Sequence, residues 1–181
     1  MWLLIDCAAV LRRLAFIPEA LDIAKITVKE SVSLEPSRLY PRALLGLASV
    51  HFFKGEYRTA ARLDELVLDF SQSSHYRPLA AFSMAAAVAQ FDGLRALTIL
   101  KENQSTLDQL PLHRQVQRYW SLARVLVKLE RTTDAVLAYK TAIVAAPDRC
   151  DARDLFLIFD ELRRLIGTKD PRLVPLAVVL Q

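Results

Sequence analysis

Glycine and cysteine are scarce in this chain, whose 181 residues include 4 glycines and 2 cysteines while 53% of the residues are hydrophobic. So little glycine argues against a turn-rich sheet protein and favours helices. Cys7 and Cys150 stand apart without a CxxC motif, so we expect neither a zinc site nor a disulfide framework. Unpaired cysteines are typical of a reducing intracellular compartment, cytoplasmic or nuclear.

Long hydrophobic runs and long runs of one charge are also missing. No apolar stretch approaches the roughly 20 residues that cross a membrane, so no membrane partner is expected. The apolar start from Trp2 to Ile5 lacks a preceding basic residue and ends at Asp6, which disfavours a signal peptide. The formal net charge of +4 comes from scattered basic residues, often close to acidic ones, so nucleic acid is a disfavoured partner.

The sequence also lacks the patterns of catalytic and metal sites. His51, His75 and His113 are isolated, and no metal-ligand spacing connects them. The serines and cysteines have no neighbouring motif such as GxSxG, and four scattered glycines cannot form a loop that binds phosphate. We therefore expect no enzyme, no metal and no cofactor.

The clearest positive feature is an internal repeat of 34 residues. The segment 41–74 contains two short amphipathic stretches joined at Gly55, and the segment 116–149 places similar residues at the same offsets without a gap. Small side chains recur where two helices of a pair would cross, at Ala48, Ala60, Ala123 and Ala135. Because small residues let helices approach closely, each segment predicts a packed helix pair.

Two weaker copies of the pattern occupy the segments 2–36 and 76–110. The alanines that mark the second helix of each pair are Ala20, Ala60, Ala96 and Ala135, separated by 40, 36 and 39 residues. Asp92 is placed to cap the second helix of the third pair. These intervals indicate a 34-residue period stretched by short inserts.

The remaining segments predict a closing helix and an apolar tail. An amphipathic helix is expected over 151–166, ended by Gly167, where it would cover the flank of the last pair. The tail 172–181 is apolar, and it either packs along the helices or binds another molecule. Packing is the favoured alternative, because soluble monomers seldom leave large apolar segments in water.

The two clear segments resemble tetratricopeptide repeats. The residues that carry the resemblance are Leu47-Ala48, Gly55, Tyr57 and Ala60 in one segment, and Leu122-Ala123, Ala135, Tyr139, Ala142 and Pro147 in the other. The chain departs from the pattern at Asp64, where an aromatic is usual, and at Glu130, which replaces the turn glycine. The resemblance implies an all-α protein with one domain over 1–181, a right-handed superhelical solenoid of about four helix pairs plus a C-terminal capping helix.

In such repeats the first helices line a concave groove that binds a protein or peptide. Carried over to this chain, the groove positions are Arg42, Leu45, Ser49, Phe52, Phe53, Gln117, Trp120, Arg124, Val127 and Lys128. For the first pair they are Trp2, Ile5, Arg12 and Arg13. The aromatic members have the alternative of packing between repeats, whereas Arg42, Arg124 and Lys128 favour binding because cations seldom belong to a core.

Two narrower comparisons refine the expected partner. The chaperone-binding members of the family hold a terminal carboxylate with a clamp of polar groups, and Leu45, Ser49 and Phe82 stand at those places here, which disfavours chaperone tails. The order of good and degenerate repeats looks like the N-terminal parts of tetratricopeptide subunits of the anaphase-promoting complex. That likeness implies homodimerisation through the groove and a place in a cell-cycle ubiquitin ligase scaffold.

The expected function is therefore a non-enzymatic protein-interaction scaffold, with homo-oligomerisation as one form of it. Two alternatives stay open. One is an RNA-binding helical-repeat protein, which the net charge permits but which Leu45 and Trp120 on the predicted inner face disfavour. The other is a regulatory fragment of a larger signalling protein.

Overall fold

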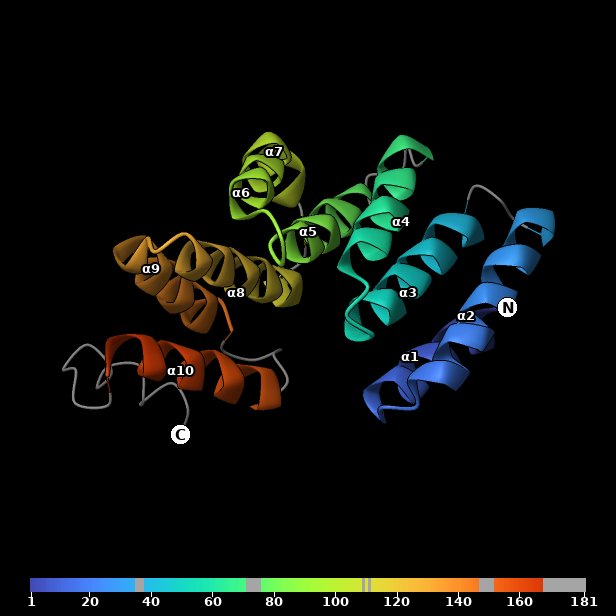
Figure 1. Ribbon diagram of the computed structural model, residues 1–181, viewed down its shortest axis with the longest axis horizontal. Coiled ribbons are helices and arrows are strands. Elements are labelled where there is room, and N and C mark those ends of the chain that lie inside the picture. Colours follow the sequence, from blue (N-terminus) through green and yellow to red (C-terminus); the bar gives the residue numbers. More distant parts are fainter. Residues whose placement is uncertain (35–37, 71–75, 109, 111, 147–151, 168–181) are drawn as a thin grey trace. The chain divides into compact units, whose positions relative to one another are not determined.

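The computed structural model describes the chain except residues 35–37, 71–75, 109, 111, 147–151 and 168–181. The described residues form helices and no strand, so the predicted all-α class is confirmed (Figure 1). The helices are α1 (Trp2–Arg13), α2 (Ile17–Leu34), α3 (Leu39–Phe53), α4 (Tyr57–Phe70), α5 (Tyr76–Val88), α6 (Gly93–Glu102), α7 (Gln104–Leu107), α8 (Leu112–Lys128), α9 (Thr132–Val144) and α10 (Ala152–Ile166). Among the described helices, none is long and apolar enough to span a membrane.

The chain divides into two compact units, Met1–Thr106 and Leu107–Gln181. The first contains α1 to α6, and the second contains α8 to α10. Each unit is considered by itself below. That the two form a single domain stays a prediction.

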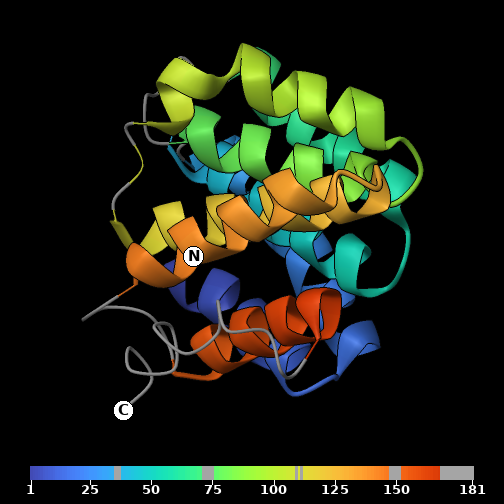
Figure 2. The same cartoon turned by 90° about the vertical axis from the view of Figure 1, so that its left-hand side faces the viewer.

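In the first unit, consecutive helices pack against each other from α1 through α6, and the odd-numbered helices also touch. Thus α3 contacts α1 on one side and α5 on the other (Figure 1). In the second unit, α9 packs against both α8 and α10 (Figure 2). Contacts made mainly with the next one or two helices along the chain are typical of proteins built from stacked helix pairs.

The helix pairs share an alanine at an equivalent place. The fourth residue of the second helix in each pair is a buried alanine, namely Ala20 in α2, Ala60 in α4, Ala96 in α6 and Ala135 in α9. Ala48 of α3 and Ala123 of α8, predicted to lie at the matching crossings, are also buried. A larger side chain at any of these places would separate the two helices.

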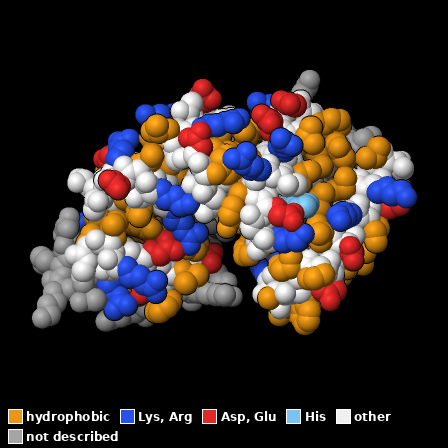
Figure 3. Space-filling view, in the orientation of Figure 1, with side chains coloured by type: hydrophobic (Ala, Val, Ile, Leu, Met, Phe, Trp, Pro, Cys, Tyr) orange, Lys and Arg blue, Asp and Glu red, His pale blue; other side chains and the backbone are white. Residues whose placement is uncertain are grey.

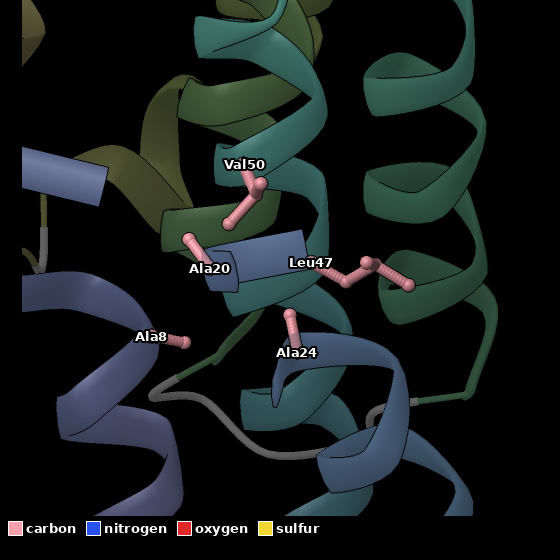
Figure 4. Packing of buried hydrophobic residues seen from close by; sticks show 5 residues of the cluster. All are labelled: Ala8, Ala20, Ala24, Leu47 and Val50. Carbon is pink, nitrogen blue, oxygen red and sulfur yellow. The ribbon is translucent and has the colours of Figure 1, made fainter. Parts of the chain in front are cut away.

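The core of the first helix pair consists mostly of small side chains. Ala8 of α1, Ala20 and Ala24 of α2, and Leu47 and Val50 of α3 form one buried cluster (Figure 4). Because alanine adds little bulk, three helices approach one another here while the larger Leu47 and Val50 fill the remaining space. The cluster joins the first pair to the second.

Three of the four pairs also use the same turn. The residue two places before the second helix has a positive φ of 65° at Ala15, 86° at Gly55 and 58° at Glu130. The next amide, that of Phe16, Glu56 or Arg131, donates to the carbonyl five residues back, at 2.9 Å in each case. This hydrogen bond and the left-handed residue define a Schellman turn, so Glu130 has the conformation of the turn glycine that it replaces.

Substitutions at these left-handed residues should have opposite effects. We expect Glu130→Gly to raise the free energy of unfolding by about 0.5–1 kcal/mol, because relief of left-handed strain exceeds the entropy cost of glycine. Gly55→Ala should lower the free energy of unfolding by a similar amount. Backbone strain is the only expected cause, because an added Cβ would meet no atom within 4 Å. Urea denaturation of the two variants beside the wild type measures both changes. Loss of stability in Glu130→Gly would show that the glutamate side chain matters more than its backbone.

Two further local predictions have clear outcomes. Asp92 caps α6 as predicted, and its Oδ1 accepts a hydrogen bond from the Arg95 amide at 2.9 Å. Gly167 follows the last residue of α10 with a φ of 86°, as expected for a glycine that ends a helix. The predicted apolar tail 172–181 and the repeat residue Pro147 lie outside the described residues, as do Cys150 and His75.

Candidate functional site

The ten predicted groove residues lie on two helices in different units. Arg42, Leu45, Ser49, Phe52 and Phe53 belong to α3, and Gln117, Trp120, Arg124, Val127 and Lys128 belong to α8. Two of the α3 residues contact side chains of α1, and two of the α8 residues contact a side chain of α10. The two sets are therefore described separately.

Arg42 and Phe53 of the first set form a face with Arg38, the residue before α3, and with side chains of α1. We call it the α1–α3 face and define it by Trp2, Asp6, Arg12, Arg38, Arg42 and Phe53. The guanidinium carbon of Arg42 lies 4.4 Å from the centre of the Trp2 ring, and Arg42 Nη2 donates to Asp6 Oδ1 at 3.3 Å. Arg38 lies 5.4 Å from the same ring. Arg12 lies 4.4 Å from the centre of the Phe53 ring.

Aromatic rings on this face remain accessible to solvent. The exposed fraction is 37% for Trp2 and 58% for Phe53, which are large values for residues that pack well in cores. Three guanidinium groups accompany one carboxylate, so the face has an excess of positive charge. Burial, and then the charge of Arg13, lowers the pKa of Arg12 below its usual value. Exposed aromatic rings beside cationic side chains are typical of protein-binding surfaces.

The end of α3 holds a small ordered cluster next to this face. The Phe52 ring makes edge contacts with the rings of Phe53 and Tyr57, with centroids 5.9 and 5.3 Å apart. His51 Nδ1 lies 2.5 Å from Glu56 Oε2, and Lys54 Nζ lies 2.6 Å from Glu56 Oε1. These contacts cross the turn at Gly55, so they fix how α3 meets α4.

Not every predicted groove residue of the first unit reaches that surface. Leu45 is partly buried and packs against the core cluster of Leu44, Val67, Tyr76 and Ala80, while Ser49 is half-buried. Ile5 of α1 is buried in the core. Arg13 is exposed at the end of α1. Arg42 and Phe53 are the predicted α3 residues that meet side chains of α1.

In the second unit, two predicted residues of α8 bind a carboxylate of α10. The guanidinium of Arg124 donates to both oxygens of Glu161, with Arg124 Nε at 3.0 Å from Oε2. Trp120 Nε1 donates to Oε2 at 2.8 Å, and the Tyr139 hydroxyl of α9 donates to the same oxygen at 3.0 Å. The Arg124 guanidinium carbon lies 4.1 Å from the Trp120 ring centre. Four side chains from three helices thus form one cluster, the Glu161 cluster.

The acid–base properties of this cluster follow from its contacts. Burial alone would raise the pKa of Glu161, but hydrogen bonds from Arg124 and Trp120 outweigh it and lower the pKa of this carboxyl below its usual value. Burial, and then the Glu161 charge, raises the pKa of Tyr139. At neutral pH the glutamate is therefore ionised and the tyrosine protonated, which is the pairing that the hydrogen bonds require.

The other predicted residues of α8 have different surroundings. Gln117 Oε1 accepts a hydrogen bond from Arg114 Nη1 at 2.8 Å within the same helix. Val127 and Lys128 are exposed near the end of α8. From the sequence, Trp120 and Arg124 were predicted to lie on one face of the helix. Their partner Glu161 was not predicted.

Asp64 of α4 is a buried polar residue whose surroundings the sequence did not reveal. Its side chain is fully buried, and neither carboxylate oxygen has a hydrogen-bond partner among the described residues. Burial raises the pKa of Asp64 well above its usual value, and the nearby Ser83 hydroxyl of α5 acts in the opposite direction by a smaller amount. Asp64 occupies the repeat position that Tyr139 holds in the second unit. The sequence marked Asp64 as unusual only because an aromatic residue is expected at this position.

Within the described part of the chain, no three His, Cys, Asp or Glu side chains lie close enough to hold a metal ion. On the face seen in Figure 3, basic and acidic side chains are interspersed with hydrophobic ones. Comparisons with known proteins give no further guide, because no family model, no curated protein and no solved structure matches the chain significantly.

Proposed function

We propose that this chain is a non-enzymatic protein-interaction scaffold of the tetratricopeptide type, and that its α1–α3 face binds an apolar and acidic segment of another protein. The observation that carries the proposal is the set of arginines beside the exposed rings of Trp2 and Phe53. Tryptophan and arginine are the residue types that most often dominate binding energy at protein interfaces. The excess of guanidinium groups favours a segment that carries carboxylates.

The repeated helix pairs support the architectural part of this proposal. Equivalent alanines and three identical Schellman turns recur along the chain. Units that repeat in this way stack into a right-handed solenoid when each is rotated slightly from the last, and the first helices then line the inner surface. Such a solenoid would present the α1–α3 face to the partner, alone or as a subunit of a larger complex.

In the second unit the corresponding surface is in part already occupied. Trp120 and Arg124 hold Glu161 of α10, so a carboxylate of the chain itself takes the place that a partner's acidic residue would take. This internal contact illustrates the chemistry that we assign to the α1–α3 face. It also makes α3, rather than α8, the better place to test binding.

Affinity capture from a cell extract tests the proposed face. We expect Arg42→Glu to weaken recovery of the partner about tenfold or more, because a charge reversal beside Asp6 repels an acidic segment. Phe53→Ala should weaken it as well by removing an exposed ring. The matched control is Arg62→Glu, which changes the same charge at an exposed position of α4 and should leave recovery unchanged. Equal recovery with Arg42→Glu and Arg62→Glu would exclude the α1–α3 face.

Single-stranded RNA is a second candidate ligand, because bases also stack on exposed rings that have arginine nearby. A gel shift at two salt concentrations distinguishes the candidates. RNA binding through phosphates weakens steeply as salt rises, whereas the protein scaffold predicts no specific shift at either concentration. A shift that Arg42→Glu abolishes would favour RNA over protein as the ligand of this face.

A further inference from the structure

The side of α1 that faces away from α2 and α3 carries a continuous apolar stripe. It consists of Leu3, Cys7 and Val10 of α1 and of Leu14, the residue that follows the helix and whose amide still donates to the Val10 carbonyl. We call these four residues the outer stripe. Leu3 is 79% exposed, Val10 52% and Leu14 61%, and Cys7 is also exposed. The opposite side of the helix holds Ile5 and Ala8, which are buried. The outer stripe shares no residue with the α1–α3 face that we propose for partner binding, and the two surfaces adjoin at Asp6.

The spacing of the outer stripe is that of a coiled-coil seam. Its members follow one another after four, three and four residues, which is the alternation of a and d positions in a heptad. In the described part of the chain, no other helix exposes four apolar side chains at this spacing. Isolated exposed leucines are ordinary, but a seam of this kind is normally covered by another helix.

The residues on the two flanks of the stripe determine which helix fits. By helical periodicity, Asp6 and Arg13 lie on one flank, and Leu4 and Leu11 lie on the other. Asp6 keeps an exposed fraction of 65% in spite of its pairing with Arg42, and Arg13 is exposed. One flank therefore offers one charge of each sign, and the other flank is apolar.

We propose that the outer stripe pairs with the same stripe of a second copy of this chain, with the two α1 helices antiparallel. In that arrangement equal flanks face each other across the two-fold axis. Asp6 then meets Arg13 of the partner subunit, Arg13 meets Asp6 of the partner subunit, and Leu4 meets Leu11 of the partner subunit. A parallel pair would instead place each charged flank against an apolar flank, so charge complementarity selects the antiparallel form.

The expected dimer is weak. A helix of 12 residues is about 18 Å long, so the seam is short and the buried surface belongs to the small, transient class of interfaces. Dimerisation should therefore depend on concentration over the micromolar range, where monomer and dimer coexist.

Sedimentation velocity over a concentration series tests the dimer. We expect the wild type to shift toward dimer as concentration rises, and Val10→Glu and Leu14→Glu to stay monomeric with unchanged circular dichroism. The control Leu94→Glu introduces the same charge at a leucine of α6 that is 70% exposed, and it should dimerise like the wild type. A wild type that is monomeric throughout, or dimerises equally well in all variants, would overturn the proposal.

Disulfide trapping tests the orientation. In the antiparallel pair Cys7 faces Val10 of the partner subunit, so Val10→Cys in a Cys150→Ser background should form a covalent dimer on mild oxidation. The Cys150→Ser chain with Val10 intact should do so at least tenfold more slowly, because its two Cys7 residues are offset along the helices. If that chain is trapped as fast as the Val10→Cys variant, the antiparallel arrangement is wrong.

Discussion

Replacing Asp64 with leucine should raise the free energy of unfolding at neutral pH by about 2–3 kcal/mol. The native carboxyl is buried in the first unit without a hydrogen-bond partner among the described residues. Leaving a buried polar group unsatisfied costs about 1–3 kcal/mol, and a charged group costs more. Leucine has the same branched arrangement of side-chain heavy atoms and removes that cost. Urea denaturation at pH 7 measures the change, with Asp69→Leu on the exposed side of α4 as the control expected to have little effect.

The pH dependence of stability gives an independent test of Asp64. Its pKa is raised in the folded state, so the folded chain holds this proton over a range in which the unfolded chain has released it. The contribution of Asp64 to stability is therefore fully present below its unfolded pKa of about 3.9 and is lost as pH rises through the folded value. Asp64→Leu should abolish this loss. A variant that is less stable than the wild type at neutral pH would show that the carboxylate has a favourable partner, such as Ser83.

Replacing Glu161 with glutamine should lower the free energy of unfolding of the second unit by about 2 kcal/mol. The native carboxylate accepts hydrogen bonds from Trp120, Arg124 and Tyr139, and bonds to a charged group contribute roughly 1.5–3 kcal/mol before allowance for solvent. Glutamine keeps the shape but loses the charge and offers one oxygen instead of two. Hydrogen exchange of α10 measures the effect, and the variant should exchange faster in that helix.

Lowering the pH should reproduce part of the loss of stability that we expect from Glu161→Gln. Because the pKa of Glu161 is lowered in the folded state, its contribution to stability is present above the unfolded pKa of about 4.3 and is lost as pH falls through the folded value. The stability of the Glu161→Gln variant should lack this pH-dependent contribution. The control Asp160→Asn alters a carboxylate that pairs with Arg163 and Arg164 of α10 itself, so it should leave the contacts of Glu161 with α8 and α9 unchanged. Equal exchange in α10 of the wild type and Glu161→Gln would contradict the account of this cluster.

Local features of this protein could be predicted from its sequence because they depend on nearby residues. The helical class follows from apolar periodicity and scarce glycine, the cap of α6 from Asp92, and the close helix crossings from alanines at a regular interval. Glu130 was recognised at the place of a turn glycine, and its left-handed backbone agrees with that place. The cap and the turn depend on residues within one or two turns of helix, whereas the crossings were predicted from a repeat along the chain.

Contacts between distant segments could not be predicted in the same way. Glu161 lies 41 residues after Trp120, and Arg42 lies 36 residues after Asp6. A repeat pattern gives the face on which each side chain lies but not the residue that approaches from the next helix. Asp64 shows the same difficulty, because the pattern marks it as unusual, but its burial depends on how α4 packs against α5.

Site-specific photo-crosslinking tests the central claim most directly. A photoreactive phenylalanine at Phe53, which is 58% exposed on the α1–α3 face, is compared with the same probe at Leu66 of α4, which is 49% exposed. The account predicts a discrete crosslinked protein from position 53 that disappears when Arg42→Glu is added, and none from position 66. Crosslinks from position 66 with none from position 53 would contradict it.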